Sequence, residues 1–345
     1  MFITGHTGFK GAWLSILVSN LGAIVKGYSL PPPEISLYNK IQSSLEMESV
    51  FGDINEFENL KKEILDFQPD YIFHLAAQPL VRESYKNPLY TLNTNIIGTA
   101  NLLQSLQGYQ KPCSVVIITT DKVYENKEWI YPYRENDNLG GYDIYSSSKA
   151  ASELIVSSYR NAFFNPEDYH LHRIGIATAR AGNVIGGGDY ATDRIVPDII
   201  RSILSNEQLT LRNPEAVRPW QHVLEPLHGY LTLGAALSAI PKKYAGSYNF
   251  GPVNNDTLTV RALVESSLKM LKKGSYVVLN EGEPHEANLL QLDISKAIKE
   301  LNWIPKYNAE EAIQITLDWY LKVEEKKNDA FACCMNDILE YYKTI

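Results

Sequence analysis

Short apolar runs alternate with amphipathic stretches through the first half of the chain. The run at residues 115–118 has no polar alternation, which is typical of a strand buried on both faces. Strands are expected at residues 2–4, 24–28, 71–75, 114–119 and 175–180, and helices at residues 12–21, 57–67, 89–106 and 145–164. This alternation predicts an α/β fold with a doubly wound, Rossmann-type parallel sheet.

The pattern becomes irregular beyond residue 182. Glycines at 186–188 predict a loop, and the elements that follow have no regular strand–helix order. Helices are expected at residues 196–204, 224–240, 260–271, 294–301 and 309–325, with strands at residues 209–211 and 248–250. We therefore expect a second, smaller mixed α/β lobe in residues 183–345, with some of that chain returning to the first domain, residues 1–182.

Composition restricts the possible partners. The 345 residues carry a net charge of −8, with a pI near 5.5, so nucleic acid and anionic membranes are not expected partners. The three cysteines, Cys113, Cys333 and Cys334, form no CxxC pair, which predicts neither a metal site nor a disulfide framework. We expect a cytoplasmic protein with no signal peptide and no membrane-spanning segment.

A glycine-rich turn follows the first predicted strand. The sequence Gly5-His-Thr-Gly-Phe-Lys-Gly11 reads GxxGxxG between a strand and a helix, where a backbone turn can hold a dinucleotide pyrophosphate. Alone, the motif also fits an ordinary βα turn. The cofactor-binding residues expected in the turn are Gly5, Thr7, Gly8, Phe9, Lys10 and Gly11.

Other positions are expected to complete the cofactor site. Asp53 and Ile54 are candidates for contact with the adenosine, although Asp53 also suits a helix start. Small residues end the third predicted strand, at Leu75, Ala76 and Ala77. The segment at residues 28–31 has no acidic residue for a ribose 2′-hydroxyl and no arginine for a 2′-phosphate, so it does not separate NAD from NADP.

Tyr145 and Lys149 have the YxxxK spacing, which places both side chains on one face of a helix. A nearby ammonium lowers the pKa of a tyrosine hydroxyl, which can then accept a proton from a sugar hydroxyl. A sequence with 22 tyrosines is expected to contain YxxxK spacings by chance. We single out this pair because its helix follows the strand end at Thr119. Asn93 is a further candidate for the cofactor site, or an ordinary residue at a helix edge.

With these motifs together, the chain resembles the CDP-glucose 4,6-dehydratases, which are extended short-chain dehydrogenase/reductases. The resemblance runs from residue 5 to at least Trp303. It is carried by GHTGFKGAWL at 5–14, HLAAQPLVR at 74–82, TTDKVYENKEW at 119–129, GYDIYSSSKA at 141–150, RAGNVIGGGD at 180–189, DRIVPDI at 193–199 and RPWQHVLEPL at 218–227.

The resemblance implies a lyase that uses NAD transiently and converts CDP-glucose to CDP-4-keto-6-deoxyglucose and water. Tyr145 would deprotonate the 4-hydroxyl as hydride passes from C4 to NAD, and Thr120 would hydrogen-bond the C4 oxygen. Asp121 would protonate the departing 6-hydroxyl. Lys122 stands where related dehydratases carry Glu, and its role as C5 base or as enolate stabiliser is left open.

The resemblance also implies substrate contacts and an assembly. Asn183 and Arg218 would contact the diphosphate, and the further substrate-binding candidates are Gln78, Arg82 and Arg194. Relatives pair through a bundle that includes the YxxxK helix, which implies a homodimer or homotetramer, although the same apolar residues would also suit packing on the sheet. The alternatives are a dehydratase of another nucleotide sugar, a 4-epimerase, or an NAD-binding sensor without chemistry.

Overall fold

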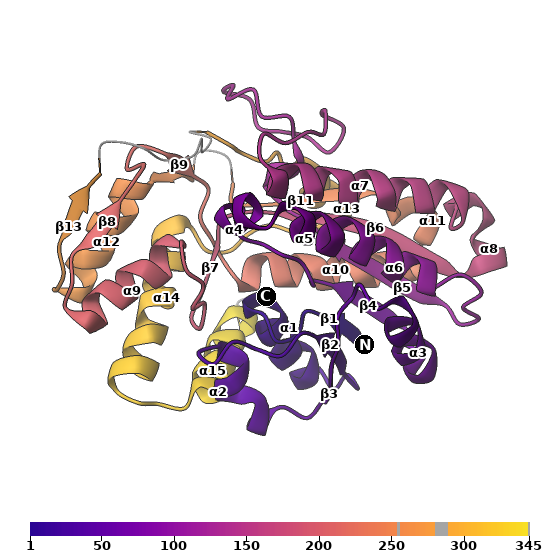
Figure 1. Ribbon diagram of the computed structural model, residues 1–345, viewed down its shortest axis with the longest axis horizontal. Coiled ribbons are helices and arrows are strands. Elements are labelled where there is room, and N and C mark those ends of the chain that lie inside the picture. Colours follow the sequence, from indigo (N-terminus) through magenta and orange to yellow (C-terminus); the bar gives the residue numbers. More distant parts are fainter. Residues whose placement is uncertain (254–255, 280–288, 344–345) are drawn as a thin grey trace.

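A parallel sheet of seven strands forms the centre of the computed structural model, which describes residues 1–253, 256–279 and 289–343 (Figure 1). The strand order is β11-β6-β5-β4-β1-β2-β3, and every neighbouring pair is parallel. The strands are β1 (Phe2–Thr4), β2 (Lys26–Ser29), β3 (Glu48–Phe51), β4 (Tyr71–His74), β5 (Cys113–Ile118), β6 (Ile174–Ala181) and β11 (Ser247–Phe250). The predicted doubly wound α/β fold is confirmed.

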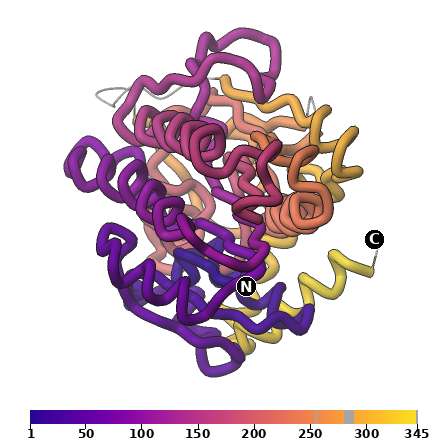
Figure 2. The backbone as a smooth tube through the Cα atoms, turned by 90° about the vertical axis from the view of Figure 1, so that its right-hand side faces the viewer, coloured from indigo at the N-terminus to yellow at the C-terminus, as the bar shows by residue number. Residues whose placement is uncertain are grey.

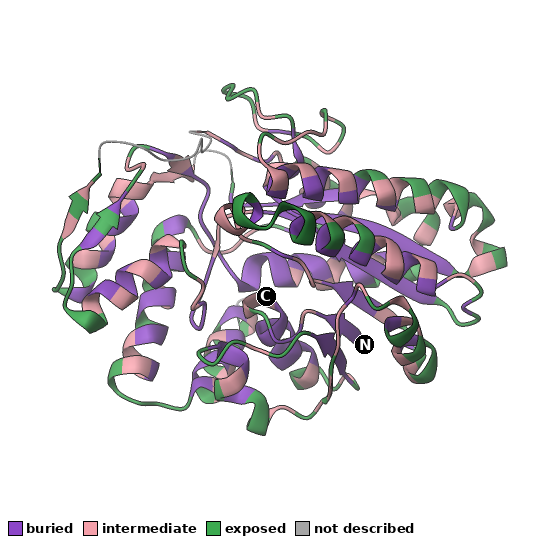
Figure 3. Ribbon diagram, in the orientation of Figure 1, coloured by how far each residue is buried: buried purple, intermediate pink, exposed green. Residues whose placement is uncertain are grey.

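Helices cover both faces of the sheet, and each face has its own hydrophobic core. On β5, Val116 and Ile118 join one core, while Val115 and Ile117 join the other. This alternation explains why the strand is apolar without interruption. The first core includes α1 (Phe9–Asn20) and α10 (Leu224–Ala239), and the second includes α3 (Phe57–Phe67), α6 (Gly98–Ser105) and α7 (Ile144–Ala162) (Figure 3).

The C-terminal half builds a smaller mixed lobe beside the sheet (Figure 1), and the C-terminal helix α15 (Ala330–Lys343) lies against the N-terminal helix α1 (Figure 2). Three two-stranded pairs lie there: β7 (Val184–Ile185) with β10 (Gln221–His222), β9 (Val217–Arg218) with β12 (Leu258–Thr259), and β8 (Leu209–Leu211) with β13 (Tyr276–Val278). Its helices are α9 (Ile195–Ser205), α12 (Val260–Leu271) and α14 (Ala309–Tyr320). The remaining helices are α2 (Leu37–Ile41), α4 (Val81–Lys86), α5 (Pro88–Leu92), α8 (Tyr169–His172), α11 (Pro241–Tyr244) and α13 (Ser295–Leu301).

Several elements differ from the sequence-based expectation. The predicted helix at residues 89–106 is divided into α5, a π-helical stretch at Asn93–Ile97 and α6, and β3 and α15 were not predicted. The edge strand β3 has only partly buried or exposed residues, so it lacks the apolar run that marked the other strands. Within the parts that the structure describes, no helix is long and apolar enough to cross a lipid bilayer.

Candidate active site

A cavity of about 1350 Å³ opens at the carboxyl ends of β1, β4, β5 and β6. This edge of an open parallel sheet is where ligands of such folds bind. The volume exceeds that of an ordinary single-ligand pocket of about 300–1,000 Å³, so it has room for a dinucleotide and a second ligand together. The predicted site residues that line it are Gly5, Thr7, Gly8, Phe9, Lys10, Gly11, Asp53, Ile54, Leu75, Ala76, Ala77, Arg82, Thr119, Thr120, Asp121, Lys122, Tyr145, Asn183, Arg194 and Arg218.

The glycine-rich turn has no room for side chains at two of its positions. Gly5 has a φ of +76°, and a Cβ there would lie 2.7 Å from the backbone nitrogen of Ala76. A Cβ on Gly11 would lie 2.1 Å from the carbonyl oxygen of Gly5. Helix α1 begins after Gly8 without a side-chain cap and without acidic residues in its first turn. The turn therefore presents helix N–H groups that suit a pyrophosphate.

Gly11→Ala is expected to weaken NAD binding by at least about tenfold, because the new methyl group would push Gly5 out of the turn that approaches the pyrophosphate. Equilibrium titration with NAD measures the change. Gly234→Ala is the matched control, since its Cβ would come no nearer than 3.2 Å to the Phe73 side chain, on a helix remote from the turn. Equal NAD affinity in both variants and the wild type would contradict the assignment of the turn.

The far end of the cavity is lined by Asp53 and Ile54, as expected for contact with an adenosine. One oxygen of the Asp53 carboxylate already accepts hydrogen bonds from the backbone and side-chain nitrogens of Asn55. The Thr7 and Ser29 hydroxyls are hydrogen-bonded at 2.7 Å where β2 ends. The hydroxyl groups of Thr7 and Ser29 and the carboxylate of Asp53 thus line the cavity near the end of β2, where the sequence has no acidic residue.

Tyr145 lies in the first turn of α7 and is 7% exposed. Burial raises the pKa of Tyr145 to about 12, partly offset by hydrogen bonding with Thr120 and by the charge of Arg194. Lys149 is buried behind it, does not line the cavity and donates to the carbonyl of Ile118 at 3.3 Å. The lowered tyrosine pKa expected from the YxxxK pair is therefore not produced by the protein alone.

The strand end after β5 carries the predicted acid. Asp121 is 2% exposed and begins a 3₁₀ turn at Asp121–Val123. One of its carboxylate oxygens accepts from the Thr120 hydroxyl at 2.8 Å, and the other accepts from the Asn183 amide at 3.2 Å. Lys122 is half-buried and lines the same cavity. The structure thus brings Thr120, Asp121 and Asn183 together beside Tyr145.

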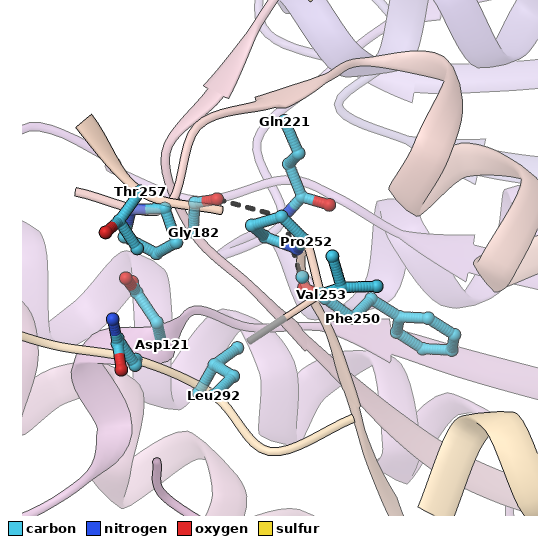
Figure 4. A pocket seen from close by; sticks show the side chains of 11 residues that line it. Asp121, Gly182, Gln221, Phe250, Pro252, Val253, Thr257 and Leu292 are labelled. Atoms are coloured by element: carbon cyan, nitrogen blue, oxygen red, sulfur yellow. Dashed lines mark hydrogen bonds between the residues drawn. The ribbon is translucent and has the colours of Figure 1, made fainter. Parts of the chain in front are cut away.

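Gly182, at the end of β6, makes room for the Asp121 carboxylate. A Cβ at this position would lie 2.1 Å from the Asp121 Cγ atom. Figure 4 shows the Asp121 side chain beside Gly182, whose carbonyl accepts a hydrogen bond from Gln221. The hollow that these residues line is about 10 Å³, large enough for about one water molecule and too small for a substrate.

Gly182→Ala is expected to lower turnover by at least about tenfold, because the methyl group would displace the acid from its place and a shift near 1 Å can cost that much. Gly251→Ala is the matched control: it lines the same small hollow, but its Cβ would meet nothing closer than 3.8 Å. Steady-state rates of both variants measure the effect, and a normal rate for Gly182→Ala would contradict this role of Gly182.

Cationic side chains line the lobe side of the cavity. Arg194 pairs with Asp189 at 2.7 Å, and Arg82 and Arg212 both approach Asp193. Arg218, which the sequence also indicated, is buried and lines the cavity. Arg212 and Asp189 were not predicted as site residues. Asp189 ends the motif at residues 180–189, which was a usable signal, whereas Arg212 lies in none of the quoted motifs.

Besides Lys149, two further candidates, Gln78 and Asn93, lie outside the cavity lining. The Gln78 amide is used inside the protein, donating to the Leu80 carbonyl and the Thr91 hydroxyl and accepting from the Leu80 backbone. Asn93 is exposed, whereas Asn95, two residues further on, is buried and donates to Ser148 and to the Gln78 carbonyl. The π-helical stretch at Asn93–Ile97 adds one residue to a helical turn, which rotates Asn95 inward.

Known proteins share both this sequence and this fold. The chain matches the family described as GDP-mannose 4,6 dehydratase over residues 2–316. It is 46% identical over 343 residues to a CDP-glucose 4,6-dehydratase of Salmonella typhimurium, covering 99% of this chain and 95% of that protein. Two dTDP-glucose 4,6-dehydratases solved with NAD share the fold. The Streptomyces venezuelae structure has a TM-score of 0.79 at 22% identity, covering 94% of this chain and 98% of that one. The Bacillus anthracis structure has a TM-score of 0.75 at 24% identity, covering 94% and 97%. By its match over residues 2–316, this chain belongs to the GDP-mannose 4,6 dehydratase family.

Proposed function

We propose that this protein is a CDP-glucose 4,6-dehydratase, which converts CDP-glucose to CDP-4-keto-6-deoxyglucose and water. The observation that carries the proposal is the meeting of a buried tyrosine, Tyr145, with a buried carboxyl group, Asp121, at one strand end. An epimerase needs no acid for a 6-hydroxyl. The 46% identity to a CDP-glucose 4,6-dehydratase supports the choice of nucleotide.

The cofactor is NAD. The turn at Gly5 and Gly11, which has no room for a Cβ, fits a pyrophosphate, and Asp53 and Ile54 fit the adenosine. Two dTDP-glucose 4,6-dehydratases that share this fold were solved with NAD, which supports NAD as the cofactor here. The chemistry that bound NAD supplies is reversible hydride transfer, first from C4 of the sugar and later to C6.

The side chains of this protein move the protons. Tyr145 accepts the proton of the 4-hydroxyl, with Thr120 hydrogen-bonded to the same oxygen. The 4-ketone makes the C5 proton acidic, and Lys122 is placed to take it or to stabilise the enolate that forms. Asp121 gives its proton to the 6-hydroxyl, which leaves as water. The C5 proton is restored when the product forms. Because the hydride taken from C4 would be returned to C6, the sugar undergoes no net redox change.

Residues 183–345 mainly hold the substrate. Arg218 and Asn183 are the proposed contacts of the diphosphate, because forked guanidinium donors suit phosphate oxygens. Arg194 is held by Asp189 and raises the local positive potential near Tyr145. These cations offset the negative charge of the substrate in a protein whose net charge is −8.

The protein is proposed to be a homodimer or homotetramer in the cytoplasm. Apolar side chains remain exposed on the helices that cover one face of the sheet, with Leu89 at 73%, Ile97 at 49% and Leu154 at 59%. Covering them against the same helices of a second copy would remove this surface from water. All three cysteines are free and buried, as suits a reducing compartment.

The decisive experiment incubates the purified protein with NAD and, separately, with CDP-, dTDP- and UDP-glucose and with GDP-mannose. Mass spectrometry is expected to detect loss of one water from CDP-glucose alone, with no net accumulation of reduced cofactor. Loss of water from a different nucleotide sugar would overturn the choice of base and keep the chemistry. An isomer of unchanged mass would replace the dehydratase with an epimerase.

A further inference from the structure

A third ionisable residue continues the row of Tyr145 and Lys149 along α7. Glu153 stands four residues after Lys149, so the three side chains share one face of the helix. Glu153 is 3% exposed and does not line the cavity. A fully buried carboxyl group that touches no ligand needs an explanation, because removing it from water is costly unless its charge is paired.

The partners of Glu153 come from three neighbouring strands of the sheet, from the end of β5 and from β6 and β11. Its carboxylate accepts hydrogen bonds from the Thr119 hydroxyl at 2.6 Å and from the Thr178 hydroxyl at 2.8 Å. Arg180 on β6 donates to it at 2.9 Å and forms an ion pair that is almost wholly buried. Ser247 of β11 donates at 3.3 Å. One side chain thus joins α7 to three strands of the sheet.

Lys149 and Glu153 together hold the catalytic end of β5. The Lys149 ammonium donates to the carbonyl of Ile118, and Glu153 accepts from the hydroxyl of Thr119, the next residue. Thr120 and Asp121 follow directly in the chain. Lys149 and Glu153, one helical turn apart, therefore connect two elements. They fix the end of β5, which leads to Asp121, relative to α7, which carries Tyr145.

We propose that Glu153 is a positioning residue of this enzyme, which fixes the Tyr145 helix to the catalytic end of β5 and supplies the negative charge that keeps Lys149 protonated. The part of this inference that concerns catalysis rests on the proposed function of Tyr145 and Asp121. The part that concerns the charge of Lys149 rests on the contacts of α7 with the sheet.

The surroundings of Lys149 show why it needs a negative neighbour. The ammonium is 6% exposed, and burial lowers the pKa of Lys149 to about 8, an effect that Glu153 opposes. The other ionisable groups that interact with its charge are Lys10 on α1 and His74 on β4. Burial lowers the pKa of Lys10 to about 7 and that of His74 to about 3, and the charge of Lys149 adds to both effects. None of these groups supplies a negative charge at neutral pH.

Arg180 in turn keeps Glu153 ionised. Burial alone would raise the pKa of the Glu153 carboxyl group, but Arg180 and the two threonine hydroxyls hold that pKa below its ordinary value. The guanidinium is itself fixed by a hydrogen bond at 2.8 Å to the Tyr124 hydroxyl, and its carbon lies 5.0 Å from the centre of that ring. The charge of Glu153 is thus maintained by Arg180, a residue that does not line the cavity.

The test compares Glu153→Gln with the double variant Glu153→Gln/Arg180→Met. The double variant removes the whole ion pair, so no unpaired guanidinium is left to unfold the protein. Thr178→Val is the matched control, because it removes one hydrogen bond to the same carboxylate and leaves the charge. NMR titration of lysines labelled with ¹³C at Cε measures the pKa of Lys149 without substrate, and Lys149→Met assigns the signal.

The expected result is a fall of about one unit or more in the Lys149 pKa in folded variants that lack the Glu153 charge, with little change in Thr178→Val. Since the ammonium is present only below its pKa, the alkaline limit of dehydration should move to lower pH by the same amount. An unchanged Lys149 pKa in the folded double variant would overturn the inference. If the wild-type protein dehydrates no nucleotide sugar, the proposed function is wrong. The Lys149 titration would still test the role of Glu153, because it is measured without substrate.

Discussion

Tyr145→Phe is expected to lower the rate of dehydration by about 10²–10⁴, the usual contribution of a positioned acid–base group. The change removes only the hydroxyl oxygen, so the buried ring still fills its place on α7. Without that oxygen, the proposed acceptor of the 4-hydroxyl proton is missing, and oxidation at C4 should be slowed. Steady-state turnover of CDP-glucose, read as loss of water by mass spectrometry, measures the fall.

The matched control is Tyr131→Phe, whose side chain is 67% exposed and lies away from the cavity lining. This variant should turn over substrate at the rate of the wild type. Tyr145→Phe should still bind NAD with near-normal affinity, since the glycine-rich turn is untouched. A Tyr145→Phe enzyme with wild-type turnover would remove Tyr145 from the mechanism.

The buried strands were the predictable part of the fold. The apolar run of β5 identified a strand covered on both faces, and the structure places its alternate residues in two separate cores. The edge strand β3 was not predicted, because its residues Glu48–Phe51 are partly buried or exposed and carry no apolar run. The break between α5 and α6 was missed for a different reason: a π-helical turn changes the backbone hydrogen bonds without an obvious change in composition.

The active site shows a similar division. Residues of contiguous motifs at strand ends, such as Gly5 and Asp121, were predictable, because a parallel sheet gathers these ends at one edge. Glu153 was not identified, although its spacing from Lys149 was a usable signal. Its importance depends on Arg180, which lies 27 residues away on β6 and becomes its neighbour only after folding. The spacing of residues within one helix cannot identify a partner on another element.

Asp121→Asn is expected to lower complete turnover by about 10²–10⁴, because an amide cannot give a proton to the departing 6-hydroxyl. The variant keeps the shape of the carboxyl group in the space beside Gly182. Tyr145 is intact, so oxidation at C4 should still occur. In a single turnover with stoichiometric enzyme, mass spectrometry should detect a sugar that has lost two hydrogen atoms and kept its 6-hydroxyl.

The oxidised sugar distinguishes two possible roles of Asp121, as the proton donor to the 6-hydroxyl and as a residue that only positions Thr120. If Asp121 only positioned Thr120, to whose hydroxyl it is bonded at 2.8 Å, Asp121→Asn would impair oxidation and elimination alike, and no oxidised sugar would accumulate. Asp70→Asn is the control, since that side chain is 73% exposed and pairs only at the surface. Turnover by Asp121→Asn at the wild-type rate would mean that elimination proceeds without the Asp121 carboxyl proton. Another group would then protonate the 6-hydroxyl.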